Sequence, residues 1–162
     1  MFKNLSDNTF IIIDEILKNE NLCKLIYYNE VNPIEQDEIE NKDKLIYENL
    51  IPIPYNPEVQ QEEKIELRLF FGDADIENRF LLDAVFVCQV VCPFDLWRIN
   101  VKDEEGIYKP RVRPYEIMHE VTETFRDKTI GKLGVIQFEN CGYRFVADKY
   151  GFYELMGSVL SI

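Results

Sequence analysis

Hydrophobic residues near the start of the chain recur with the spacing of a helix. Between Thr9 and Tyr28 the apolar positions are Ile12, Ile13, Ile16, Leu17, Leu22, Cys23, Leu25 and Ile26. This pattern predicts an amphipathic helix, for which Asp7 or Asn8 is available as the N-cap. We expect a break in this helix near Asn19–Asn21.

The acidic segment Glu35–Asn49 has too few apolar residues to decide its structure. The pattern fits a lightly packed helix and, equally, a mobile acidic loop with a short helical end. Three prolines follow within Ile51–Pro57. They exclude a helix and predict an extended connection over 51–63.

From Lys64 onward the pattern changes to the alternation that is typical of strands. Lys64–Phe71 places apolar residues at every second position, which predicts a half-buried strand that ends in a turn at Gly72–Asp73. Leu81–Cys92 predicts a longer strand whose even positions are all apolar, so that Cys88 and Cys92 face a core.

The odd positions of that strand are nearly as apolar, but they include Asp83 and Gln89. This composition predicts cover on both faces, the second cover being a helix or another subunit.

The rest of the chain mixes strands with one helix. A short strand over Leu96–Val101 and a polar turn over 102–106 precede Pro114, which suits the first turn of a helix over 114–127. The apolar residues of that helix are Ile117, Met118, Val121 and Phe125. The aromatic C-terminal third predicts two or three antiparallel strands, with a turn at Asn140–Gly142.

These elements predict one α+β domain spanning 1–162, a mainly antiparallel sheet with two or three helices packed against it. Within it, 1–50 is a helical part, 51–63 a proline-rich connection and 64–162 the sheet with its one helix. A chain of 162 residues, 46% of them apolar, can bury a core without disulfides or metals. The four cysteines, which form no CxxC pair, are predicted to be reduced.

Charge excludes some classes of partner. A formal net charge of −12 argues against a protein that grips nucleic acid through its phosphates. No apolar run approaches the roughly 20 residues that cross a bilayer, and the N-terminus lacks the pattern of a signal peptide. We therefore expect that the protein does not associate with a membrane. We also expect that it is assembled in the cytoplasm.

The acidic run Asp73, Asp75 and Glu77 has the alternate spacing that begins a calcium loop. The loop's sixth-position glycine is missing, however, and Ala84 replaces the bidentate glutamate. An acidic turn or the start of a short helix is the better interpretation. Cys88 and Cys92 would lie about 13 Å apart on a strand, too far for one metal or a disulfide.

His119 is the only histidine, flanked on the predicted helix by Glu116 and Glu123. These three could bind a metal, but a solvated helix face is the commoner arrangement. No nucleophile–histidine motif or glycine-rich phosphate loop occurs. We predict no catalytic residue, no metal and no cofactor, and hence no enzyme. The alternative is a metal-dependent enzyme that uses His119 or the acidic turn.

Positive charge is concentrated at Lys109, Arg111 and Arg113, spaced by two along the chain. On an extended segment these side chains share one side. They form either a solvated strand edge or a basic ridge that meets the acidic surface of a neighbouring copy, head to tail, in a ring.

Several segments together resemble the tail terminator and neck proteins of tailed bacteriophages. They are LCKLIYYNEVNP, the apolar strand ending in CPFDLWRI, RPYEIMHEV, GKLG and YGFYEL. The resemblance runs from about Leu22 onward, and the acidic insert Glu35–Asn49 has no match in it.

The resemblance implies a structural subunit of the virion that forms a ring, commonly of six copies, at the head–tail junction. Such a ring ends the tail tube, contacts the tail tube protein and the head connector, and lets DNA pass as cargo without binding it specifically. Contacts are expected in Asp95–Ile99 and Arg111–Tyr115, because aromatic residues and arginine dominate interface energetics. The candidate contact residues are Asp95, Trp97, Arg98, Lys109, Arg111, Arg113 and Tyr115.

Two alternatives stay open. A head-completion or adaptor protein would form a ring on the portal side, for example of twelve copies. An acidic module that mimics DNA would instead bind a basic partner through Glu35–Asn49, as a monomer or dimer.

Overall fold

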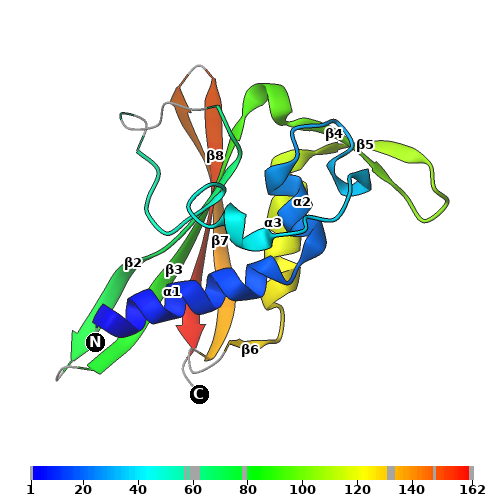
Figure 1. Cartoon of the computed structure of the whole chain (residues 1–162). Coiled ribbons are helices and arrows are strands. Elements are labelled where there is room, and N and C mark those ends of the chain that lie inside the picture. Colours follow the sequence, from blue (N-terminus) through cyan, green and yellow to red (C-terminus); the bar gives the residue numbers. More distant parts are fainter. Residues whose placement is uncertain are drawn as a thin grey trace.

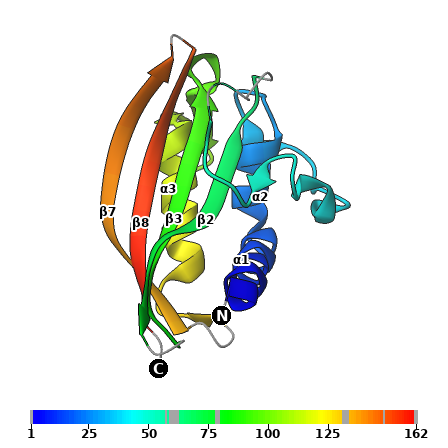
Figure 2. The same cartoon turned by 90° about the vertical axis from the view of Figure 1, so that its left-hand side faces the viewer.

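The computed structural model describes residues 2–56, 58, 63–77, 80–130, 134–147 and 149–160. Within these residues, three α-helices lie against one face of a curled six-stranded sheet, as Figure 1 shows. In Figure 2 the sheet is seen from its other face, with the helices behind it and to one side. The predicted α+β class is confirmed.

Two consecutive helices form the N-terminal part, α1 (Phe2–Leu17) and α2 (Glu20–Tyr27). The predicted break is confirmed, and Asn19 produces it by accepting a hydrogen bond from the backbone N–H of Leu22 at 3.0 Å. Asp7 and Asn8 are not N-caps, because α1 already begins at Phe2.

The sheet has the strand order β1-β2-β3-β8-β7-β6 among the described residues. Only β1 pairs in parallel with its neighbour, and every other pair in this order is antiparallel. The strands are β1 (Leu50–Ile51), β2 (Glu66–Glu77), β3 (Phe80–Pro93), β6 (Thr129–Ile130), β7 (Gly134–Ala147) and β8 (Tyr150–Leu160).

The core lies between the sheet and the helices. The even positions of β3 face it, so the predicted burial of Cys88 and Cys92 is confirmed. Burial raises the pKa of the Cys92 thiol to about 12 and that of Cys88 further still. Phe86 lies at the centre, where its ring packs against Phe71, Phe125 and Phe138 at centroid distances of 5.8 to 6.4 Å.

The opposite face of β2 and β3 is covered by the extended segment 52–56. Arg68 donates a hydrogen bond to the carbonyl of Pro54 at 3.0 Å, and Gln89 accepts one from the backbone N–H of Tyr55 at 2.9 Å. Arg68 also pairs with Glu66 at 2.6 Å, and both side chains are buried. The prediction that only one face of this strand is buried is therefore wrong here. The prediction that both faces of β3 are covered is confirmed at Gln89, where the segment 52–56 of the same chain supplies the second cover. The side chain of Asp83 lies outside the described residues.

Two predicted turns are wrong because long strands run through them. Gly72–Asp73 lies within β2, where the register shifts between Phe71 and Ala74. Asn140–Gly142 lies within β7, with a shift between Phe138 and Asn140. Bulges absorb these turn-like residues without ending the strand. The acidic run 73–77 is accordingly strand, and its side chains lie outside the described residues.

The acidic segment is a loop, as the second alternative held. It contains two short 3₁₀ turns, η1 (Pro33–Glu35) and η2 (Lys42–Leu45), and its anchors Ile39 and Leu45 are buried.

The predicted helix near 114–127 is confirmed as α3 (Arg113–Phe125), with Ile117, Val121 and Phe125 in the core. The described residues of the connection 51–63 contain no helix.

Candidate interaction surface

A β-hairpin projects from the body of the molecule. β4 (Arg98–Lys102) and β5 (Tyr108–Val112) pair antiparallel with each other and form a separate two-stranded sheet. We call Arg98–Val112 the arm; Figure 1 shows it extending to the right, away from the large sheet. All of β5 is exposed. An arm with so little cover in a single copy is well suited to contact another chain.

The arm is held firmly at both ends. At its turn, the Asp103 carboxylate accepts hydrogen bonds from the backbone N–H groups of Glu105 and Ile107 at 3.0 and 2.9 Å. At its base, the backbone N–H of Arg113 donates to the carbonyl of Trp97 at 2.7 Å, and beside the turn Lys102 forms an ion pair with Glu35 at 2.7 Å. The arm is thus preorganised, which reduces the entropy lost on binding.

Arg113 does not share the side of Lys109 and Arg111, so this part of the predicted basic ridge is wrong. β5 ends at Val112 and α3 begins at Arg113, which turns the side chain into the interior. It is fully buried, and burial lowers the pKa of its guanidinium. The guanidinium donates to four backbone carbonyls at 2.5 to 2.9 Å, those of Leu25, Tyr28, Glu30 and Leu96. Arg113 therefore ties the arm's base to α2 and has a structural role.

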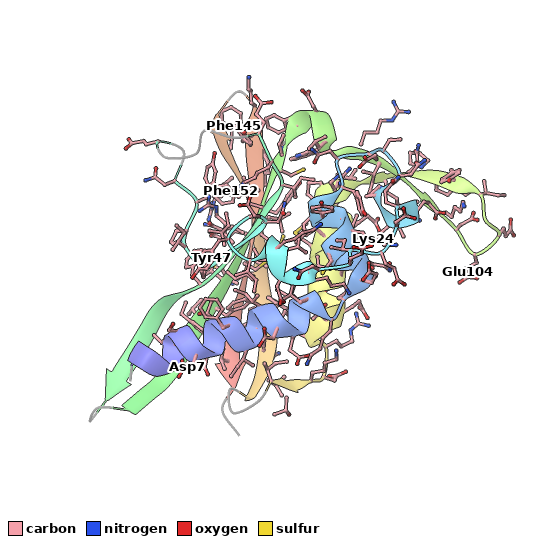
Figure 3. All side chains as sticks on the ribbon, in the orientation of Figure 1. Asp7, Lys24, Tyr47, Glu104, Phe145 and Phe152 are labelled. Carbon is pink, nitrogen blue, oxygen red and sulfur yellow. The ribbon has the colours of Figure 1, made fainter. Side chains whose placement is uncertain are left out.

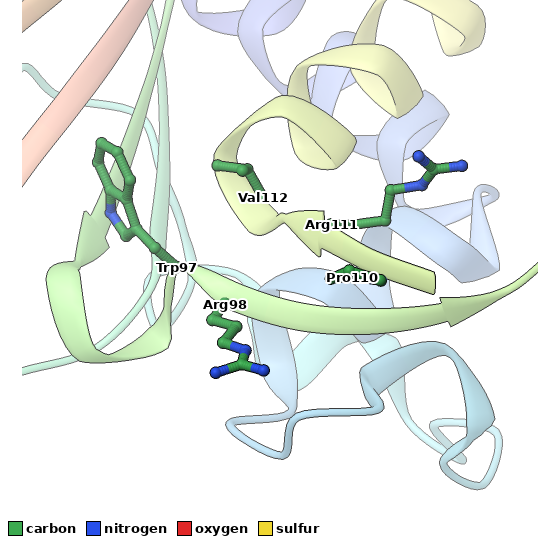
Figure 4. Close-up of a pocket in the computed structure, with 5 residues that line it drawn as sticks. All are labelled: Trp97, Arg98, Pro110, Arg111 and Val112. Atoms are coloured by element: carbon green, nitrogen blue, oxygen red, sulfur yellow. The ribbon is translucent and has the colours of Figure 1, made fainter. Parts of the chain in front are cut away.

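A hollow of about 390 Å³ lies at the base of the arm. Trp97, Arg98, Pro110, Arg111 and Val112 line it, and Figure 4 shows how they are placed around it. The Trp97 indole N–H donates to the carbonyl of Cys92 at 3.1 Å, which fixes the orientation of the ring. The hollow thus combines an apolar floor with arginine side chains.

Aromatic side chains, some exposed and some partly buried, continue this surface onto β7 and β8. Tyr143 and Tyr153 lie within 6.1 Å of Trp97, measured between ring centroids, and Tyr115 contacts Tyr153 at 5.3 Å. Phe145 is 66% exposed, Tyr115 50% and Tyr143 42%. We call the set Trp97, Tyr115, Tyr143, Phe145 and Tyr153 the rim patch. Exposed aromatic side chains gathered in this way are typical of an interaction site.

The charges beside the rim patch are incompletely neutralised. Arg98 is exposed and forms no ion pair with any described residue. Arg111 lies 3.7 Å from Glu116, and Lys109 lies 3.5 Å from Asp103. These long, exposed pairs contribute little to stability. The surface therefore suits an acidic partner.

The predicted contact residues are brought together in part. Trp97, Arg98 and Arg111 line one hollow, and Tyr115 joins Trp97 through Tyr153. Lys109 lies further out on the arm. Asp95 is exposed, but it lines a different hollow with Glu63, Pro93, Phe94 and Lys149.

Comparison with known proteins gives one match. A sequence model of the YomW family matches residues 19–159, most of the chain. The chain belongs to the YomW family. This family is phage-derived, of the Bacillus SPbeta type, so the chain is a phage-associated protein. No curated protein and no solved structure matches it.

The YomW match supports the phage origin that the resemblance implied, and a place in the virion stays a prediction. In this YomW family chain His119 is exposed on α3. The described residues contain no group of three or more histidine, cysteine or acidic side chains that could hold a metal. Among them, no helix is long and apolar enough to cross a membrane.

Sequence analysis missed Tyr143 and Phe145 as surface residues. Their aromatic character predicts strands, which is correct, but it does not show that their side chains are exposed. A signal was available, since Tyr143 and Phe145 alternate on one face of a strand and nothing in the sequence required a cover for them.

Proposed function

We propose that the chain is a structural subunit of a tailed phage that assembles into a ring at the head–tail junction. The ring ends the tail tube and joins it to the head connector. The YomW family match supports the phage context, and the open edges of the large sheet support ring formation.

Among the described residues, neither edge of the sheet has a partner strand over most of its length. On β2, β1 pairs only with Leu67 and Arg68, so no described strand pairs with its outer side from Leu69 to Glu77. On β7, β6 pairs only with Gly134 and Val135, and the outer side has no described partner strand beyond Val135. Exposed edges of this length are templates for pairing with another chain.

The directions of the two edges suit a head-to-tail contact. Three successive antiparallel pairings, β2 with β3, β3 with β8 and β8 with β7, make β2 and β7 antiparallel to each other. A rotation about an axis along the strands keeps these directions, so β7 of one copy meets β2 of the next as an antiparallel pair. Repeated contacts of this heterologous type close into a ring when the rotation between copies permits, and otherwise form an open filament. This pair of open, antiparallel edges is the observation that carries the proposal.

Such a ring would act by shape and contact, without catalysis. Its partners would be further copies of itself, the tail tube protein and the connector, and its location the virion neck after assembly in the host cytoplasm. Every copy carries a formal charge of −12, so passing DNA would be repelled and would not adhere.

Two alternatives predict different copy numbers. An adaptor on the portal side would use the same open edges in a larger ring. A DNA-mimic module is favoured by one observation, the exposed carboxylates of the acidic loop, which are Asp37, Glu38, Glu40, Asp43 and Glu48. It would stay monomeric or dimeric and bind a basic protein.

The test is native mass spectrometry over a concentration and salt series, with negative-stain images of large species. Closed rings of six copies are expected, and twelve would favour the adaptor. A dimer would indicate symmetric pairing of two β7 edges and would contradict the ring. A monomer that persists even with purified tail tubes, and is absent from purified virions, would overturn the proposal.

A further inference from the structure

We infer that the loop carrying Tyr47 in one copy packs on the rim patch of the next copy. We call residues 37–48 the Tyr47 loop. The inference rests on the ring proposed above, and it names the side chains that supplement the pairing of the strand edges.

Tyr47 is held outward by its backbone. Its φ of 65° lies in the left-handed region, which tyrosine rarely adopts. Its backbone N–H donates to the carbonyl of Leu50 at 2.8 Å, so the conformation is locked by the start of β1. The side chain is 63% exposed and touches one ring, that of Phe10, at 6.4 Å among the described residues. Such strain concentrates at functional positions.

The register of the sheet places the Tyr47 loop and the rim patch at the same height. Leu50, just after the loop, is paired with Leu67 on β2, which is paired with Val90 on β3. Val90 is in turn paired with Tyr153 on β8, and Tyr153 with Tyr143 on β7. The loop thus adjoins the β2 edge on the row that ends at Tyr143 on the β7 edge.

Within one chain the sheet keeps these two surfaces apart, because β2, β3 and β8 lie between the loop and β7. When β7 of one copy pairs with β2 of the next, the neighbour's Tyr47 loop comes to the rim patch. One contact between copies therefore includes both the pairing of the strand edges and the packing of the Tyr47 loop on the rim patch. The stagger between strands of a closed sheet adjusts the relative height of the two copies.

Charge complementarity favours this occupant. The Tyr47 loop carries exposed carboxylates, whereas the hollow beside the rim patch has Arg98 without a described ion-pair partner and Arg111 in a long one. In Figure 3, Tyr47 lies far from the tip of the arm at Glu104, which is not part of the proposed contact. An exposed aromatic side chain on an acidic loop matches an aromatic patch bordered by arginines.

Engineered disulfides test the contact. In a Cys141→Ser background, which removes the exposed thiol and leaves Cys23, Cys88 and Cys92 buried, Tyr47→Cys is combined with Tyr143→Cys. Mild oxidation should produce a ladder of covalent multimers that ends at the copy number of the wild-type ring. Tyr47→Cys with Tyr108→Cys, on the exposed arm, is the matched control and should give no ladder.

A second measurement covers the case in which the cysteine variants do not assemble. Tyr47→Ala should weaken self-association at least about tenfold, as loss of an aromatic anchor does, whereas Tyr108→Ala should leave it unchanged. Wild-type rings together with no ladder and unchanged association of Tyr47→Ala would overturn this inference alone. Absence of any wild-type ring would overturn both it and the proposed function.

Discussion

Arg111 and Arg113 lie two residues apart, yet their surroundings are opposite. Arg111 is exposed on the arm, with a carboxylate at 3.7 Å, whereas Arg113 is buried and donates to four backbone carbonyls. The difference arises because β5 ends and α3 begins between them. Spacing by two places side chains on one side only while the strand continues.

The same contrast separates the two phenylalanines that mark the core and the rim patch. Phe86 is enclosed by three other phenylalanine rings, whereas Phe145 is 66% exposed at the open edge of β7. The helix-covered core stabilises the single copy. The exposed Phe145 contributes little to that stability, and we assign its contribution to assembly.

Truncating Phe86 should have the largest effect. Phe86→Ala is expected to lower the free energy of unfolding by about 4 kcal/mol, because it removes buried area and leaves a cavity. The matched change Phe145→Ala should alter stability by less than about 0.5 kcal/mol. Chemical denaturation of both variants at monomer concentration measures this, and equal losses would refute the distinction between core and rim patch.

Removing the buried guanidinium should rank next. Arg113→Met keeps much of the side-chain volume but leaves four carbonyls without their donor, so a loss of about 3 kcal/mol is expected. Arg111→Met serves as the control and should stay within about 0.5 kcal/mol of wild type. Similar results for the two arginines would show that Arg113 is not a structural tie.

High pH should weaken the core through its thiols. Burial raises the pKa of Cys23 to about 11 and that of Cys92 to about 12, from an ordinary value of 9.0. Above about pH 9 the unfolded chain releases these protons while the folded chain keeps them, so stability falls as pH rises, by about 2 kcal/mol per thiol near pH 11. Denaturation midpoints from pH 8 to 11 measure this loss of stability. In Cys92→Ala the midpoint should decline less steeply with pH than in the wild type, and equal slopes for the two proteins would contradict the role of this thiol.

Relieving the backbone at Tyr47 should have the smallest effect on stability. Tyr47→Gly is expected to raise the free energy of unfolding of the monomer by about 0.5–1 kcal/mol, since glycine adopts positive φ freely. The same variant should assemble less well than wild type. Thermal unfolding and sedimentation measure the two quantities, and a variant that gains stability without losing assembly would remove Tyr47 from the contact.

The sequence predicted those parts of the fold that depend on local periodicity. The alternation of Leu81–Cys92 and the stripe on α3 correctly placed Cys88 and Val121 in the core. Asn140–Gly142 is not the predicted turn, because pairing with β8 along the length of β7 outweighs local turn preference. Glu66 and Arg68 were expected on an exposed face because their cover comes from the distant segment 52–56, which no local pattern indicates.

The candidate surface was predicted less completely than the fold. Trp97, Arg98 and Arg111 were selected by residue type, and the arm brings them together. The contribution of β7 was missed, since its approach to Trp97 depends on the packing of β8 and α3 between distant parts of the chain. Tertiary contacts of this kind are not encoded in spacing.

Hydrogen–deuterium exchange along β7 tests the central claim most directly. In an isolated copy, every second amide of an edge strand lacks a partner and exchanges rapidly. If copies join through their open edges, the unpaired amides between Ile136 and Phe145 should become protected as rings form and lose that protection on dilution. If β7 exchanges as rapidly in the assembled protein as in the monomer, the sheet edges are not the contact and this account of assembly is wrong.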